Sequence, residues 1–137
     1  MKKIIIVEDD KITQQFYSMF FNKYGYEFLI TDNGDKILET LLTEDVGLIL
    51  MDINLSNSYL NNEKIDGIKL SQIIKSYEQL KNIPLVLVTA SSLSNQLKQF
   101  LSETNAEEIV TKPILDYSRF LIKINNYLAS WQKKIKY

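Results

Sequence analysis

Short apolar runs alternate with segments of helical periodicity along the chain, and this alternation limits the folds that the sequence can adopt. Five runs are expected to be strands, and they cover residues 3–7, 27–31, 46–51, 85–89 and 107–110. Three of these runs are almost entirely apolar, which is typical of strands covered on both faces. The sequence shows no internal repeat and no linker rich in Gly, Pro or Ser. We therefore interpret residues 1–137 as one domain of five βα units.

Apolar residues recur at helical spacing between these runs, so helices are expected to cover both faces of a sheet. Two stripes have their members at positions i, i+4, i+7 and i+8: Ile12, Phe16, Met19 and Phe20, then Leu93, Leu97, Phe100 and Leu101. Shorter stripes begin at Ile37 and Leu70, and a last helix is expected to end near residue 131, before a short basic tail. Right-handed crossovers then favour a doubly wound, five-stranded parallel α/β sheet of the flavodoxin-like type, with strand order 2-1-3-4-5.

Two absent residue types and a net charge close to zero limit the chemistry that this chain can perform. The chain has no cysteine and no histidine, which excludes a thiolate nucleophile, an imidazole base and a thiolate zinc site. A net charge of -1 provides no overall positive field for nucleic acid or an anionic membrane, and we assign no function to the basic tail. The N-terminal apolar run is too short for a signal peptide or a membrane span. We expect a cytoplasmic protein with neither nucleic acid nor membrane as a direct partner.

Acidic side chains follow two of the expected strands. Glu8, Asp9 and Asp10 come directly after the first strand, and Asp52 comes after the third. The expected strand order makes these strands neighbours, so the carboxylates should meet at one edge, where ligands bind in this architecture. Ionised carboxylates about 5 Å apart repel by roughly 3 kcal/mol at an effective dielectric near 20, and Mg²⁺ or Mn²⁺ would offset that repulsion. Taken alone, the run 8–10 is most often a helix N-cap with favourable first-turn charge.

Two further polar residues stand at the expected ends of the fourth and fifth strands, namely Thr89 and Lys112. A phosphoryl group on an aspartate would present three oxygens, for which a metal ion, a hydroxyl and an ammonium are suitable partners. Each residue is also common at a strand end, and Pro113 is expected simply to terminate its strand because it lacks an N–H. No P-loop or dinucleotide fingerprint is present.

Four motifs are together similar to those of the response-regulator receiver family, in order and spacing over nearly the whole chain: Ile5-Ile6-Val7-Glu8-Asp9, Leu50-Met51-Asp52-Ile53, Val88-Thr89-Ala90 and Thr111-Lys112-Pro113. The resemblance implies a two-component signalling protein that carries an aspartyl phosphate. It also implies a protein that catalyses only its own phosphorylation and dephosphorylation, and is therefore not an enzyme acting on free substrates.

The resemblance assigns roles to the acidic edge. It implies that Asp52 is the phosphoacceptor and that Glu8 and Asp9 form the acidic metal pair. Asp9 and Asp52 would be direct side-chain ligands of Mg²⁺, with Mn²⁺ as an alternative, and Asn54 would add its backbone carbonyl. Asn54 and Ser91 correspond to variable positions that tune the phosphoryl lifetime in this family.

The resemblance also assigns roles to the last two strand ends. Thr89 corresponds to the switch hydroxyl, Ala90 to the small neighbour that leaves access, and Lys112 to the phosphate-binding ammonium. The Lys112-Pro113 peptide is expected to be cis, as in the family.

Three features depart from the family pattern. The loop 54–65 is longer than usual, Ser56 replaces the customary proline, and Ile109 stands where a switching Tyr or Phe is common. The loop, which contains Tyr59, is either a contact for a specific partner or a tolerated surface insertion, and we favour the insertion. We therefore expect the readout of phosphorylation to differ from the usual coupling of threonine and aromatic side chains.

The implied partners are a sensor histidine kinase or histidine phosphotransfer protein as phosphoryl donor, and a downstream protein target. The target would bind the surface of helix 4, strand 5 and helix 5, and the chain would be a monomer or a phosphorylation-dependent dimer. Alternatives are a phosphorylation-independent adaptor, the receiver portion of a hybrid histidine kinase, and a Mg²⁺-dependent phosphohydrolase. The phosphohydrolase is disfavoured because Asn54 occupies the place of its second catalytic carboxylate.

Overall fold

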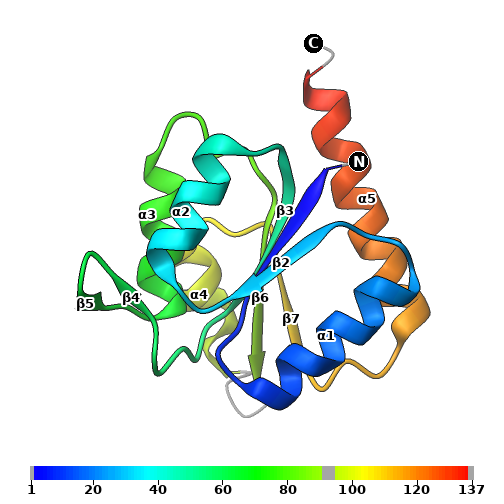
Figure 1. The fold of residues 1–137 in the computed structure, drawn as a ribbon, viewed down its shortest axis with the longest axis horizontal. Helices are drawn as coiled ribbons and strands as arrows, with labels where there is room; N and C mark the ends of the chain where they lie inside the picture. Colours follow the sequence, from blue (N-terminus) through cyan, green and yellow to red (C-terminus); the bar gives the residue numbers. More distant parts are fainter. Residues whose placement is uncertain (1, 91–94, 136–137) are drawn as a thin grey trace.

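A computed structural model describes residues 2–90 and 95–135 of the chain, and it contains one five-stranded parallel sheet between two layers of helices (Figure 1). The sheet has the order β2-β1-β3-β6-β7. Its strands are β1 (Lys3–Val7), β2 (Phe28–Thr31), β3 (Val46–Asp52), β6 (Leu85–Ala90) and β7 (Glu108–Lys112). The prediction of a flavodoxin-like sheet with order 2-1-3-4-5 is confirmed, since β4 and β5 belong to a separate hairpin.

Within the described residues, five α-helices connect and cover the strands: α1 (Lys11–Lys23), α2 (Gly34–Thr43), α3 (Gly67–Ser76), α4 (Leu97–Thr104) and α5 (Tyr117–Ile135). Helices α1 and α5 lie on one face of the sheet, and α2, α3 and α4 lie on the other (Figure 1). Helix α5 continues to Ile135, past the expected end near residue 131. The part of the chain that the structure describes has no helix with the length and apolar character needed to cross a membrane.

Side chains alternate between two hydrophobic cores along each central strand. In β1, Ile4 and Ile6 pack under α1 and α5, whereas Ile5 and Val7 pack under α2 and α3. Strand β3 is buried at every residue. This double coverage explains the nearly continuous apolar runs, because a strand with helices on both faces has no side exposed to water.

Asp52 and Lys112 are the last residues of their strands rather than the residues that follow them. Asp52 pairs in register with Val88, and Lys112 pairs with Ala90, so β3, β6 and β7 each run slightly further than the sequence suggested. Strand β2 begins one residue later than expected, at Phe28. Neighbouring parallel strands supply backbone partners at these positions, which holds Asp52 and Lys112 in extended conformation.

Helix α1 is oriented differently from the expected stripe. It buries Tyr17, Phe20 and Phe21, while Ile12 and Met19 are 78% and 74% exposed. The prediction that Ile12 and Met19 cover the sheet is therefore wrong. Aromatic rings bury more apolar area than these two side chains, so the helix turns its aromatic face to the core. In α4, Leu97, Phe100 and Leu101 lie in a helix as expected, and Leu93 lies outside the described residues.

The long loop 54–65 contains an antiparallel hairpin that the sequence reading did not identify, made of β4 (Tyr59–Leu60) and β5 (Glu63–Lys64). Its turn is formed by Asn61 and Asn62, with φ of 51° and 67°. A two-residue hairpin turn of type I′ requires positive φ at both central positions, and Asn tolerates this conformation. Leu55 and Ile65 are buried where the loop leaves and rejoins the core, and the Gly67 N–H donates to the Ile53 carbonyl at 3.3 Å.

Candidate functional site

Three carboxylates meet at the carboxyl edge of the sheet. Glu8 follows β1, Asp52 ends β3, and both are buried, at 1% and 5% exposure. Asp9 is partly exposed next to them, and one carboxylate oxygen from each of the three residues lies within 4.8 Å of the others. The parallel register that pairs Val7 with Met51 accounts for this, because it sets the two strand ends side by side.

Lys112 bridges two of these carboxylates from the end of β7. Its Nζ lies 2.9 Å from Glu8 Oε1 and 3.3 Å from Asp52 Oδ2. Residues far apart in the sequence thus form one buried ionic cluster. The ammonium compensates part of the charge of the carboxylates, which would otherwise be costly to bury together.

Opposing interactions act on the pKa of Glu8. Burial, together with its proximity to Asp52, raises the pKa of Glu8 to about 7, although the hydrogen bond from Lys112 acts in the opposite direction. Burial alone would lower the pKa of Lys112, but the hydrogen bond to Glu8 and the charge of Asp52 outweigh it and raise that pKa. A carboxyl group that titrates near neutrality in the protein alone is one that a bound cation would keep ionised.

Asp9 is held by the loop that follows β3. Its Oδ2 accepts hydrogen bonds from the Ser56 N–H at 2.7 Å, the Ser56 hydroxyl at 3.0 Å and the Asn57 N–H at 3.3 Å. Burial acts to raise the pKa of Asp9, but the hydrogen bonds from Ser56 and Asn57 outweigh it, so this pKa lies below the usual range. Asp9 therefore stays ionised and oriented, as a metal ligand should be.

Asp10, the third acid of the run, has a structural role. Its carboxylate accepts from the Thr13 N–H at 2.9 Å and the Thr13 hydroxyl at 2.7 Å, which caps the N-terminus of α1. The interpretation of the run 8–10 as a helix N-cap thus applies to Asp10. Glu8 and Asp9 instead join Asp52 in the cluster.

Thr89 and Ala90 lie at the end of β6, the strand between β3 and β7. The side chain of Thr89 is completely buried, and within the described residues its hydroxyl has no hydrogen-bond partner. An unsatisfied buried hydroxyl costs about 1–3 kcal/mol, so this position favours a state that supplies an acceptor. A phosphoryl oxygen on a neighbouring strand end is such an acceptor.

The other expected site residues fall around this cluster. The Asn54 N–H donates to Asp52 Oδ1 at 3.0 Å, which brings the backbone of residue 54 against the acid. The Lys112-Pro113 peptide is cis, as expected. Ser91 lies outside the described residues.

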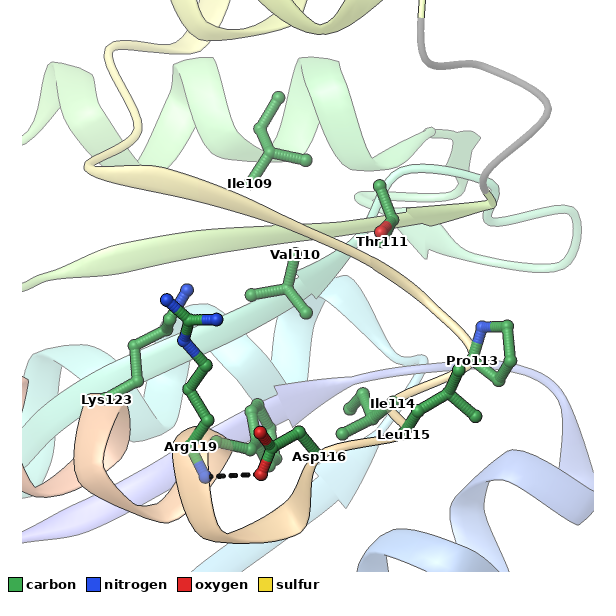
Figure 2. Close-up of a pocket in the computed structure, with 10 residues that line it drawn as sticks. Ile109, Val110, Thr111, Pro113, Ile114, Leu115, Asp116, Arg119 and Lys123 are labelled. Atoms are coloured by element: carbon green, nitrogen blue, oxygen red, sulfur yellow. Dashed lines mark hydrogen bonds between the residues drawn. The ribbon is translucent and has the colours of Figure 1, made fainter.

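Ile109 lies on β7, away from the acidic cluster. It is partly buried and packs against the core under α2, α3 and α4, whereas Val110 packs against the core on the opposite face. Figure 2 shows the two side chains projecting from opposite sides of the strand, beside a cavity of about 350 Å³ between β7 and the start of α5. Asp116 Oδ1 accepts from the Arg119 N–H at 3.0 Å there and caps α5.

The sequence reading assigned no role to Gly67, which stands close behind Asp52. A Cβ atom on Gly67 would lie 2.0 Å from the Asp52 carbonyl oxygen and 2.8 Å from Ile53 Cα. Only glycine allows the start of α3 to approach the strand end this closely. The Asp66-Gly67 pair after the loop was visible in the sequence, but the close approach depends on tertiary packing.

The donor set fits a hard divalent cation. Glu8, Asp9 and Asp52 offer only carboxylate oxygens, and the Asn54 backbone lies next to them. Oxygen ligands of this kind suit Mg²⁺ and Mn²⁺. With Lys112 and the Thr89 hydroxyl on the neighbouring strands, the site carries the charges and donors needed to bind a phosphoryl group.

Comparisons with known proteins agree with this geometry. Residues 4–125 match the family described as "Response regulator receiver domain". The polar-differentiation response regulator DivK of Brucella anthropi is 28% identical over 128 residues, which are 93% of this chain and 97% of DivK.

Solved structures share the fold. NtrX from Brucella abortus has a TM-score of 0.80 at 20% identity, and the match covers 99% of this chain and 29% of NtrX, so the chain spans less than a third of that protein. The receiver domain of the sensor histidine kinase PA1611 from Pseudomonas aeruginosa PAO1 has a TM-score of 0.76 at 18% identity, with 93% of this chain and 98% of that domain covered. The PA1611 structure holds a magnesium ion in its active-site cleft.

Proposed function

Because the chain belongs to the response regulator receiver domain family of two-component signalling proteins, we propose that Asp52 accepts a phosphoryl group from a phosphohistidine in a Mg²⁺-dependent reaction. The donor would be a sensor histidine kinase or a histidine phosphotransfer protein. The observation that carries the proposal is the convergence of Asp52 with Glu8, Asp9 and Lys112 at one sheet edge. Four residues from three strand ends meet there with the charges that phosphoryl transfer needs.

In the transfer, a carboxylate oxygen of Asp52 attacks the phosphorus in line, and the P–N bond to the donor imidazole breaks. Lys112 already contacts Asp52 Oδ2, so its ammonium needs little movement to reach the incoming oxygens. The Thr89 hydroxyl, which has no hydrogen-bond partner among the described residues, would gain an acceptor in the phosphoryl group. Ala90, which follows it, leaves room for the phosphoryl group.

Asp9, Asp52 and the Asn54 carbonyl would hold the cation, with Glu8 beside them. Bound there, Mg²⁺ would neutralise charge on the transferring group. Mg²⁺ is also the ion that the PA1611 receiver domain coordinates, which supports it over Mn²⁺. Hard oxygen ligands alone do not separate the two ions.

The readout would use the surface of α4, β7 and α5, where a downstream protein target binds and where a phosphorylation-dependent dimer could form from the monomer. Ile109 stands at the position of the usual aromatic switch, and its aliphatic side chain packs inward on β7 (Figure 2). Thr89 would then be coupled to β7 through side-chain packing on the strand rather than through rotation of an aromatic ring. We place this signalling in the cytoplasm, with no nucleic acid or membrane as a direct partner.

Intact-mass analysis after incubation with acetyl phosphate and Mg²⁺ tests the proposal. Wild type should gain one phosphoryl adduct, and Asp52→Asn should gain none. Asp10→Asn is the matched control, because Asp10 is an acid of the same edge that caps α1, and it should be modified like wild type. A wild type that stays unmodified while folded, or an adduct that persists in Asp52→Asn, would contradict the proposal.

Beryllofluoride separates the switch from a phosphorylation-independent adaptor. With Mg²⁺, the switch predicts a saturable change in the amide signals of Thr89 and Lys112 that Asp52→Asn abolishes. An adaptor in which the acidic edge is only structural shows no such change.

A further inference from the structure

The loop 54–65 is attached to the cation site through Asp9. Three donors from Ser56 and Asn57 converge on one oxygen, Asp9 Oδ2, at 2.7, 3.0 and 3.3 Å. They orient the carboxylate without occupying Oδ1. Groups that hydrogen-bond a metal ligand fix its direction and charge, and their loss typically lowers metal affinity.

The loop is itself fixed at its far end by α2. The Asn61 N–H donates to both carboxylate oxygens of Asp35, at 3.2 and 3.3 Å, and Asp35 lies in the first turn of α2. The Tyr59 carbonyl oxygen lies 2.6 Å from the place of a Cβ on Gly34, so the hairpin backbone packs directly on the helix start. The loop is therefore docked against the domain instead of extending freely from it.

The two attachments are joined by a short piece of ordered chain. Only Ser58 separates Asn57 from Tyr59, and it is completely buried, with its carbonyl accepting from the Ile65 N–H at 2.9 Å. A displacement of the hairpin would therefore move the Ser56 and Asn57 amides relative to Asp9.

We propose that the loop 54–65 positions Asp9 for the divalent cation, so that docking of the hairpin on α2 and cation binding strengthen each other. The inference rests on the proposed function in taking Asp9 as a cation ligand. It gives Ser56 and Asn57 the role of positioning residues and Asp35 the role of an anchor. Coupling of this kind is reciprocal: whatever shifts the hairpin changes cation affinity by the same factor by which the cation shifts the hairpin.

Direct titration of the full chain with Mn²⁺, followed by the electron paramagnetic resonance signal of the free ion, measures this coupling without any phosphoryl donor. Ser56→Pro removes the N–H and hydroxyl donors and introduces the residue usual in the family, and the Mn²⁺ affinity should fall roughly tenfold. Ser56→Ala keeps the N–H and should lose less. Asp35→Ala should weaken binding about two- to fivefold, since it acts one step further away.

Asp32→Ala is the matched control for Asp35→Ala. It removes the same charge near the same helix start, and Asp32 makes no hydrogen bond to the hairpin among the described residues. A purely electrostatic effect would weaken Mn²⁺ binding equally in both variants. Positioning by the loop predicts that Asp35→Ala has the larger effect.

Amide hydrogen exchange gives the reciprocal readout. Mg²⁺ should slow exchange of the Ser56, Asn57 and Asn61 amides in wild type, and should slow that of Asn61 much less in Asp35→Ala. The coupling is overturned if Ser56→Pro and Asp35→Ala, both shown to be folded, bind Mn²⁺ as wild type does, or if wild type binds no Mn²⁺. A wild type that binds Mn²⁺ in this pattern but gains no phosphoryl adduct would instead contradict the proposed function and leave the coupling standing.

Discussion

Lys112 and Glu8 form an ion pair across the edge of the sheet, with Lys112 Nζ 2.9 Å from Glu8 Oε1, although 104 positions separate them in the chain. Glu8 is buried and Lys112 is mostly so, at 1% and 28% side-chain exposure. Glu8 directly follows β1, the first strand in the chain, and Lys112 ends β7, the last one. The stability of the fold therefore depends on the ionisation of these two side chains.

Removing the ammonium should therefore destabilise the cation-free protein. Lys112→Ala leaves Glu8 and Asp52 without their shared donor, and we expect a loss of about 2 kcal/mol in the free energy of unfolding, measured with urea at pH 8 and EDTA. Lys123→Ala is the control, because its ion pair with Glu108 is more exposed and should contribute less than about 1 kcal/mol. Equal losses in the two variants would contradict a special role for Lys112.

The raised pKa of Glu8 predicts an unusual dependence of stability on pH. Between its ordinary value of 4.5 and about 7, the folded protein binds more protons than the unfolded chain, so stability falls as pH rises through this window. The fall is at most about 3 kcal/mol in the absence of a cation. The raised pKa of Lys112 and the lowered pKa values of Asp9 and Asp10 act outside this window.

Glu8→Gln should remove most of this slope, because it keeps the shape of the side chain without the titration. Urea unfolding at pH 5, 6, 7 and 8 with EDTA measures it. Addition of Mg²⁺ to wild type should flatten the slope, since a cation favours ionised Glu8. A slope that Glu8→Gln leaves unchanged would show that another group is responsible.

The buried hydroxyl of Thr89 should be dispensable for folding and necessary for the response to phosphorylation. Thr89→Val removes a buried hydroxyl that has no partner in the part of the chain that the structure describes, so the free energy of unfolding should be unchanged or up to about 1 kcal/mol higher. Binding of beryllofluoride should weaken, because its fluorine atoms lose a donor. Thr104→Val is the comparison: Thr104 is equally buried, but its hydroxyl donates to the Phe100 carbonyl and accepts from the Ala106 N–H, so about 1–2 kcal/mol should be lost.

Gly67→Ala should damage both the fold and the acceptor. The new Cβ would meet the Asp52 carbonyl oxygen at 2.0 Å, and backbone atoms cannot yield cheaply. We expect a loss of about 3 kcal/mol by thermal unfolding and slower phosphorylation by acetyl phosphate, since Asp52 must shift. Gly25→Ala has open space but φ of +75°, so only about 1 kcal/mol of backbone strain is expected, with normal phosphorylation.

Much of the architecture was predictable from the sequence because it depends on pattern. Apolar runs and helical stripes define the βα units, and the rules for parallel sheets then fix the neighbours of each strand. Parallel strands end at a common edge, which is why Asp52, Thr89 and Lys112 could be placed together before any coordinates.

Features set by tertiary packing were not predictable in this way. The orientation of α1 depends on whether its aromatic or its aliphatic side chains pack into the core. The aromatic side chains are buried, and Ile12 and Met19 are left exposed. The contact of Ser56 with Asp9 joins residues 47 positions apart through a loop whose hairpin was not identified. The Asn61-Asn62 pair is a local sign of the turn, because Asn tolerates the positive φ that both residues adopt.

The backbone hydrogen bond from Gly67 to Ile53 closes the base of the loop, so the chain returns to the point from which it left. A segment of different length or composition can replace the hairpin without changing the path of β3 or α3. This junction is thus a place where the fold can acquire new sequence during evolution. Related proteins could diversify how they tune the reaction there while the groups that perform it stay the same.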